Sequence, residues 1–184
     1  MTLSIAKQPT TRDPIGVTEA RRYLVAALLV LGNLLLPALV HRLPQGGQAF
    51  LPIFFFTLVG GWRFGAAAGI LTGTLSPVVN HLLTGMPSGP DLPSLTLQSV
   101  LLGGLAAAAA ARGRKPGLGA LAALVGLHQA LTLLPLALQA GIPPALAALQ
   151  LRAPGLLLQV AGGSALLSWL ARLPAGSGDA ARGE

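Results

Sequence analysis

Long apolar runs alternate with short polar segments along most of the chain, and each run has the length of a helix. A helix that crosses the hydrocarbon core of a bilayer needs about 20 apolar residues. The polar segments between the runs are short enough to be turns or small loops. The pattern therefore predicts six helices, at residues 23–40, 49–61, 64–84, 95–111, 118–140 and 153–173.

Three places depart from a regular series of membrane-spanning helices. Residues 49–61 are rich in phenylalanine but too short to cross comfortably, so we expect a short or partly re-entrant second helix. Residues 141–152 contain Pro143 and Pro144, which predict a loop or a partial helix. Pro135 is expected to kink the fifth helix.

Composition supports a membrane protein. Only 9% of the 184 residues are charged and 53% are hydrophobic, whereas globular proteins carry about 25% charged residues. We therefore predict an all-α integral membrane protein with six transmembrane helices in one domain, residues 23–173. Residues 1–22 form the N-terminal tail and residues 174–184 a flexible C-terminal tail. A signal peptide is the competing interpretation of the first run, but no A-x-A-like site follows it.

The basic residues indicate how the helices are oriented. A net charge of +7 would suggest nucleic acid in a soluble protein, but here Lys and Arg lie in tails and short loops. With both termini cytoplasmic, ten of the twelve fall on the inside, and only Arg42 and Arg152 lie outside. This distribution follows the positive-inside rule. We expect a multi-pass protein of the plasma or inner membrane, with lipid and not nucleic acid around it.

Several reaction classes lack their usual residues in this sequence. Cysteine is absent, so the chain has no thiolate metal site or thiol nucleophile, and no phosphate-binding G-x-x-x-x-G-K-[ST] loop occurs. No Asp or Glu falls within a predicted helix, which argues against ion-coupled transport. We expect no cofactor, no metal and no enzymatic activity. An intramembrane enzyme that uses His81 or His128 as a base is a distant alternative, because only hydroxyls such as that of Ser76 could serve as the nucleophile.

Neutral hydrogen-bonding side chains lie within several of the predicted helices. With both ends inside, some fall in the outer half of the membrane and the others near its middle, and together they could bind an uncharged polar solute. Arg42 and Arg152 could pair with a carboxylate if the solute has one. The alternative is that each side chain makes only an interhelical hydrogen bond, worth about 0.6 kcal/mol. The candidate binding residues are Asn80, His81, Gln98 and Gln159 in the outer half, Asn33 and His128 nearer the middle, and Arg42 and Arg152 in the outer loops.

The third predicted helix carries a stripe of small residues. Gly65, Gly69 and Gly73 recur at every fourth position, a spacing that lets a second helix approach closely in lipid. The helix then turns polar and ends in a Gly/Pro-rich segment, residues 84–87. We interpret it as one wall of a binding site.

This part of the chain resembles a known family. The block GWRFGAAAGILTGTLSPVVNHLLTGMP, preceded by FLPIFFFTLVG, is similar to the matching region of the substrate-binding S components of energy-coupling factor (ECF) importers. In that family a Pro-containing second helix leads through a Gly-rich turn into a helix that ends in a Ser-Pro…Leu-Leu-Thr-Gly-Met-Pro segment. The matching positions are Pro52, Gly60, Gly61, Ser76, Pro77, Leu82, Leu83, Thr84, Gly85, Met86 and Pro87.

The resemblance implies a role and partners. S components capture a vitamin, a precursor or a metal from outside and dock on a membrane T protein that carries two cytoplasmic ATPases. No histidine follows Met1 as in the metal-binding members, so an organic vitamin is expected. The ligand would enter between two lid loops, residues 42–48 and 86–94. The main alternative is a membrane scaffold or assembly protein that binds no solute.

Overall fold

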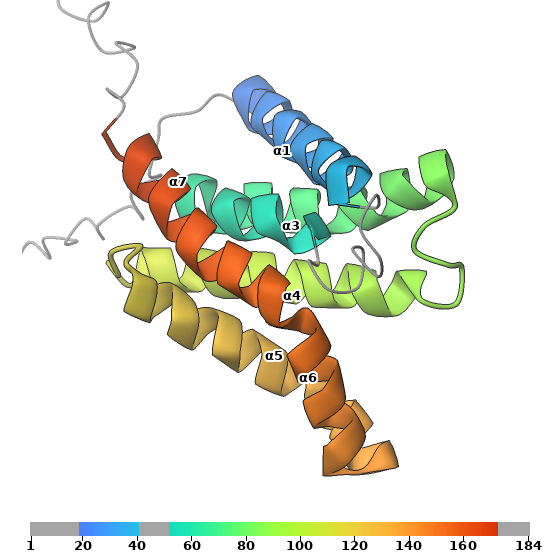
Figure 1. The fold of residues 1–184 in the computed structure, drawn as a ribbon. Helices are drawn as coiled ribbons and strands as arrows, with labels where there is room; N and C mark the ends of the chain where they lie inside the picture. Colours follow the sequence, from blue (N-terminus) through green and yellow to red (C-terminus); the bar gives the residue numbers. More distant parts are fainter. Residues whose placement is uncertain (1–18, 41–51, 173–184) are drawn as a thin grey trace, which may run out of the picture.

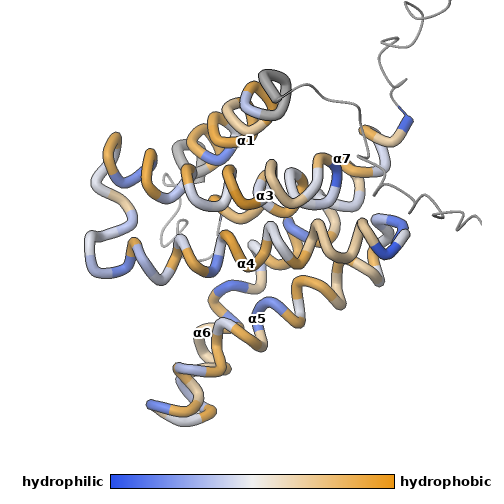
Figure 2. Tube along the Cα trace, turned by 180° about the vertical axis from the view of Figure 1, so that it is seen from behind, coloured by the Kyte–Doolittle hydropathy of each residue, from blue (hydrophilic) through white to orange (hydrophobic). Residues whose placement is uncertain are grey.

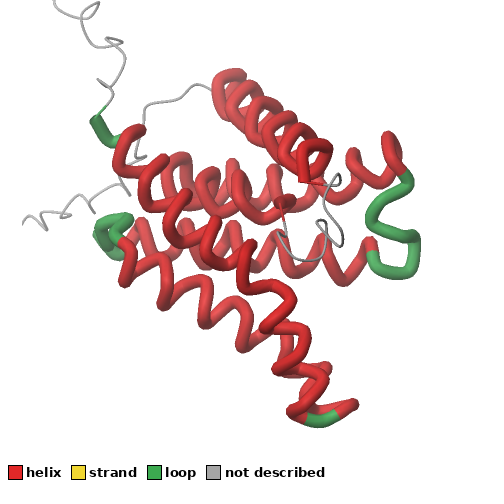
Figure 3. The backbone as a smooth tube through the Cα atoms, in the orientation of Figure 1, coloured by secondary structure: helices red, strands yellow, loops and turns green. Residues whose placement is uncertain are grey.

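The computed structural model describes residues 19–40 and 52–172, and these ranges consist of helices and short turns without a strand (Figures 1 and 3). Four helical segments in them are long and apolar enough to cross a membrane. These are Pro52–Thr84, Leu92–Ala111, Leu118–Ala140 and Ile142–Leu170. The prediction of an all-α protein with membrane-spanning helices is confirmed at this level. Arg42 and the whole of its predicted lid loop, residues 42–48, lie outside the described residues.

Helix α1 (Glu19–Val40) begins four residues before the predicted start and ends where predicted. One face carries exposed apolar side chains, including Leu24 and Leu28, and the opposite face buries Leu29 and Asn33. The buried face packs on α3 (Phe55–Thr84), where Leu29 lies close to Gly60. Helix α1 therefore presents one side to lipid and the other to the bundle.

Helix α3, which follows the short 3-10 turn η1 (Pro52–Phe54), is a hairpin of two helical arms. The backbone leaves helical geometry at Gly65, with φ 87° and ψ −177°. A Cβ placed on Gly69 would lie 2.7 Å from the Cα of Gly61, although eight residues of straight helix would separate the two by about 12 Å. Residues 52–64, the first arm, and residues 66–84, the second arm, therefore lie side by side. They correspond to the predicted short second helix and the third helix.

The glycines of α3 have two different structural roles. Gly69 and Gly73 pack tightly against α4 (Leu92–Ala111): a Cβ on Gly73 would lie 2.9 Å from the Ser99 carbonyl oxygen. Gly65 does not belong to this stripe, contrary to the prediction, because nothing lies within 4 Å of the position of its Cβ. Its positive φ is the left-handed conformation that glycine adopts without a steric penalty. Gly65 is therefore the turn between the arms.

The C-terminal helices form a long antiparallel pair. Helix α5 (Leu118–Ala140) has the predicted bounds, and α6 (Ile142–Leu157), the π-turn η2 (Leu158–Gly162) and α7 (Gly163–Leu170) follow as one rod. The prediction of a loop or partial helix at residues 141–152 is wrong. Pro143 and Pro144 lie at the start of α6, where a missing backbone N–H costs no helical hydrogen bond.

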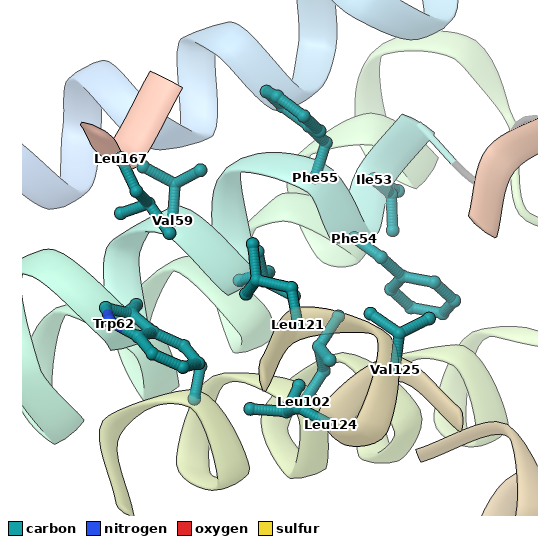
Figure 4. Packing of buried hydrophobic residues seen from close by; sticks show 12 residues of the cluster. Ile53, Phe54, Phe55, Val59, Trp62, Leu102, Leu121, Leu124, Val125 and Leu167 are labelled. Carbon is teal, nitrogen blue, oxygen red and sulfur yellow. The ribbon is translucent and has the colours of Figure 1, made fainter. Parts of the chain in front are cut away.

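The first arm lies at the centre of the hydrophobic core. Phe54 and Leu58 are fully buried, and they pack with Leu102 of α4, Leu121 of α5 and Leu167 of α7. Figure 4 shows the Phe54 ring near α5 and Leu167 beside the first arm. The short phenylalanine-rich segment is thus an interior element enclosed by longer helices.

The outer surface of the bundle is apolar. Large hydrophobic side chains on the outside of α3, α4 and α5 are strongly exposed, among them Leu82, Leu97 and Leu138. Figure 2 shows hydrophobic residues along the helices and a hydrophilic turn between α4 and α5. An apolar surface of this extent matches the hydrocarbon core of a bilayer.

Basic residues gather at one end of the bundle, which we call the basic end. Arg63 donates to the Leu170 carbonyl oxygen at 3.4 Å, and the Ser164 hydroxyl donates to that of Pro116 at 3.0 Å. These bonds bring together the turn of α3, the turn between α4 and α5, and the end of α7. Their basic residues are Arg63, Arg112, Arg114, Lys115 and Arg172. The α3–α4 loop and the α5–α6 turn lie at the opposite, distal end.

Candidate functional site

Asn80 and His81, two of the predicted ligand contacts, hold the loop that follows their own helix. The Asn80 Nδ2 donates to the Met86 carbonyl oxygen at 2.8 Å, and the His81 Nδ1 lies 2.7 Å from that of Pro87. A carbonyl oxygen can only accept, so we assign the His81 proton to Nδ1. Both side chains thus shape the distal loop, residues 85–91, which is shorter than predicted because α4 begins at Leu92.

Replacing Asn80 with alanine is expected to loosen the distal loop. One buried hydrogen bond contributes about 0.5–1.5 kcal/mol, so the amides of residues 85–91 should exchange with deuterium about 2–10 times faster. Leu82→Ala is the matched control, because Leu82 is 75% exposed in the same turn of α3. Equal exchange in the two variants would show that the Asn80 bond does not hold the loop.

Asn33, another predicted ligand contact, is used within the protein. Its Nδ2 donates to the hydroxyls of Thr57 at 3.2 Å and Ser76 at 2.9 Å, while its Oδ1 accepts the Phe56 N–H at 3.1 Å. The Thr57 hydroxyl also lies 3.2 Å from that of Ser99. Asn33 therefore joins α1 to both arms of α3 and satisfies a free N–H in the first turn of α3. This buried network is structural.

A second set of polar groups, the polar chain, connects α4, α5 and α6. The His128 Nε2 donates to the backbone carbonyl oxygen of Gln98 at 2.9 Å, which assigns the proton to Nε2. The Nδ1 then accepts from the Gln129 Nε2 at 3.4 Å. The Gln129 Oε1 in turn accepts from the Arg152 Nη1 at 3.2 Å. Two predicted site residues, Gln98 and His128, are thus bonded directly, and Gln129 connects His128 to a third, Arg152.

Gln129 belongs to the polar chain but was not among the predicted site residues. It is almost fully buried and links His128 to Arg152. The available signal was the pair of neighbouring polar residues, His128 and Gln129, within an apolar helix. Phe54 also borders the polar chain, with its ring centre 5.6 Å from that of His128 in an edge-on arrangement. The first arm of α3 therefore forms part of the wall of the candidate site.

Several buried polar atoms have no hydrogen-bond partner among the described residues. Gln159 is 1% exposed, and neither its Oε1 nor its Nε2 has a hydrogen-bond partner among the described residues. The Gln98 Oε1 also lacks a hydrogen-bond partner among the described residues, whereas the Gln98 Nε2 donates to the Ser94 hydroxyl at 3.0 Å. Such atoms are rare, since each costs about 1–3 kcal/mol. The hydroxyls of Thr72 and Thr96 are the other buried atoms of this kind in the described ranges.

Contacts of neighbouring residues on the rod show that Gln159 lies next to the polar chain, on its side toward the basic end. A Cβ on Gly163 would touch Leu58 and Leu121 at 3.2 and 3.7 Å, whereas Arg152 bonds Gln129 farther along α5. The rod and α5 run antiparallel, so Gln159 lies between these two contacts. It sits in the π-turn η2. Irregular turns of this kind occur frequently at functional sites.

The chemistry offered here is hydrogen bonding with one added positive charge. Gln98 and Gln159 present amide atoms, and Arg152 presents a guanidinium. Within residues 19–40 and 52–172, no group of three His, Asp or Glu side chains could hold a metal ion. The arrangement is therefore suited to binding a polar organic molecule.

No protein-family model matches this chain, and no curated protein or solved structure does either. The chemistry of the site consequently rests on the contacts described above.

Proposed function

We propose that the protein is the substrate-binding membrane subunit of an ATP-driven importer. It captures a water-soluble vitamin or a related precursor at the distal end and delivers it through a partner T protein and two cytoplasmic ATPases. In this proposal six helical segments enter or cross the membrane of the cell, with both termini in the cytoplasm. The six are α1, the two arms of α3, α4, α5, and the rod formed by α6, η2 and α7.

The distribution of charge supports this orientation. The basic end faces the cytoplasm according to the positive-inside rule. Gln98 precedes the last residue of α4, Ala111, by 13 positions, a rise of about 20 Å. In a hydrocarbon core about 30 Å thick, the polar chain then lies in the outer half. A solute from outside would reach it from the distal end.

The observation that carries the proposal is the pair of glutamine side chains with unpartnered atoms. Burying them without partners destabilises the empty protein, and in a membrane no bulk water is present to satisfy them. A ligand that both donates and accepts hydrogen bonds would remove this penalty. The residues are therefore better explained by a bound molecule than by packing alone.

A scaffold that binds no solute is the second candidate, and it has its own support. Asn33, Asn80 and His81 all bond within the protein, as expected where polar residues only hold helices and loops together. The unpartnered atoms of Gln159 are what this candidate leaves without explanation.

Thermal unfolding in a maltoside detergent with water-soluble vitamins tests the proposal. A ligand at 100 times its dissociation constant should stabilise the protein by about 2.7 kcal/mol. Co-expression with a T protein and two ATPases should give a complex that purifies together. A protein that no vitamin stabilises and that recruits no ATPase would favour the scaffold.

Replacing Gln159 with leucine is expected to have two opposite effects. The free protein should gain about 1–3 kcal/mol of stability, because unpartnered polar atoms leave the core. A vitamin that stabilises the native protein should bind at least about tenfold more weakly to the variant, a loss of about 1.4 kcal/mol.

Gln150→Leu provides the control for this variant. Gln150 lies exposed on the same rod, so its replacement should change stability by less than about 0.5 kcal/mol and leave binding intact. Unchanged ligand affinity in Gln159→Leu would remove Gln159 from the site.

A further inference from the structure

Arg152 is a cation within a candidate membrane span, away from the other basic residues. It belongs to the Ile142–Leu170 segment, and every other Lys or Arg in the described ranges lies at the basic end or in the first turn of α1. The contacts of Leu29 with Gly60 and of Gly32 with Phe56 show that α1 also starts toward the basic end. Arg152 therefore has no role in the cluster that marks the cytoplasmic side.

No acidic side chain of the described ranges neutralises Arg152. These ranges contain two acidic residues: Glu19 opens α1, and Asp91 accepts a hydrogen bond from Ser88 in the distal loop. The hydrogen bond of Arg152 is to the neutral Gln129 amide. An unneutralised cation is costly in a membrane, and ionisable groups there usually mark a binding site or an ion path.

We propose that Arg152 binds the anionic group of the substrate, which is an organic acid that also carries an amide-type group. This inference rests on the proposed function. Gln129 occupies one N–H of the guanidinium, and the remaining N–H groups can bind a carboxylate in a two-pronged arrangement. The acid group then neutralises the charge that no acidic side chain of residues 19–40 and 52–172 pairs with.

The position of Gln159 defines the other part of the substrate. It follows Arg152 by seven positions on one rod, two helical turns with a rise of about 10 Å. Its Oε1 and Nε2 both lack partners in the part of the chain that the structure describes, so they match a group that donates and accepts side by side, such as an amide or a urea. The substrate is an acid with such a group about two helical turns away.

Phospholipid could supply an anionic group to the same guanidinium. The polar chain lies about 20 Å from the basic end by helix rise, which places it beneath the outer headgroups of a hydrocarbon core about 30 Å thick. A soluble acid that enters from the distal end explains Gln159 as well, whereas a headgroup explains only Arg152.

Matched pairs of acids and neutral derivatives test the proposal. The probes are biotin with biotin methyl ester and pantothenate with panthenol, each titrated in thermal unfolding of the full chain in maltoside. We expect at least one acid to bind about tenfold or more tightly than its neutral partner. In Arg152→Gln this preference should fall to about one, with the affinity for the neutral partner retained.

Two further variants guard against a folding defect. Arg152→Lys keeps the charge and should retain part of the preference for the acid, because a lysine lacks the two-pronged geometry. Arg114→Gln removes an exposed charge at the basic end and should retain the whole preference. In each variant the readout is the affinity for the acid divided by the affinity for its neutral derivative. A general loss of stability lowers both affinities and leaves this ratio unchanged.

The outcomes separate the two proposals. If a neutral derivative binds the native protein as tightly as its acid, or if Arg152→Gln keeps the preference, the function stands and the anion site is overturned. If neither member of any pair stabilises the protein, the acid-with-amide substrate is overturned, while the proposed function is decided by the full vitamin panel and by recruitment of the ATPases. Nanodiscs of phosphatidylcholine and phosphatidylglycerol complete the test: stabilisation by phosphatidylglycerol alone, lost in Arg152→Gln, would identify a lipid headgroup and overturn the soluble acid.

Discussion

Replacing Gly103 with alanine is expected to destabilise the membrane domain severely. A Cβ at this position would lie 2.6 Å from the Gly69 carbonyl oxygen and 3.1 Å from its Cα. These are backbone atoms, which cannot move aside as the end of a flexible side chain can. Overpacking of a core costs about 1–3 kcal/mol and occasionally more, and here α4 must move away from the second arm of α3. Thermal unfolding in detergent should show the loss.

Gly104 provides a closely matched control. It follows Gly103 in α4, but nothing lies within 4 Å of the position of its Cβ. Gly104→Ala should therefore be neutral or stabilising by up to about 1 kcal/mol, from the higher helix propensity of alanine. Equal stability of the two variants would mean that α3 and α4 are not in backbone contact.

Replacing Asn33 with leucine is expected to have the second largest effect. Leucine has the same branched arrangement of heavy atoms but leaves the Phe56 N–H and the Ser76 hydroxyl without the partner that Asn33 provides. Each buried group left unpaired costs about 1–3 kcal/mol. The loss falls on the junction of α1 with both arms of α3, so α1 should detach before the rest of the bundle unfolds.

Thr74→Leu tests whether this effect is specific. Thr74 is an exposed polar residue on the second arm, so the same kind of substitution there should change stability by less than about 0.5 kcal/mol. Hydrogen exchange of α1 amides provides the local readout. If α1 remains as protected in Asn33→Leu as in Thr74→Leu, the Asn33 network contributes little.

The extent of most helices could be predicted because the signals that define them are local. The predicted bounds of α5, and the predicted C-terminal residues of the second arm and α4, agree with the structure. Apolar runs bounded by glycine, proline and basic residues carry that information in the sequence. Two of the errors arose where one residue type has more than one structural role. Gly65 looked like a packing residue and is a turn, and Pro143 looked like a break and opens a helix.

The residue types of the candidate site could be predicted from the sequence, but not which of these residues contact one another. Gln98, His128 and Arg152 come together with Gln129 because α4, α5 and α6 cross at that level. Nothing in the spacing of four residues on three helices indicates which of them meet. Asn33 was expected at the ligand, yet its bonding groups are used by hydroxyls and a backbone N–H far away in sequence.

By itself, the sequence determined that the chain is helical, that its surface suits lipid, and that its interior holds neutral polar groups, whereas Arg152 was expected in an outer loop and lies in helix α6. These properties follow from composition and from hydrophobicity along single segments. Only the tertiary structure decided that the short phenylalanine-rich arm lies at the centre, which polar groups satisfy one another, and that Gln159 has no partner among the described residues. Hydrogen bonds and close packing between helices depend on distances between residues far apart in the chain, and those distances exist only once the helices have assembled.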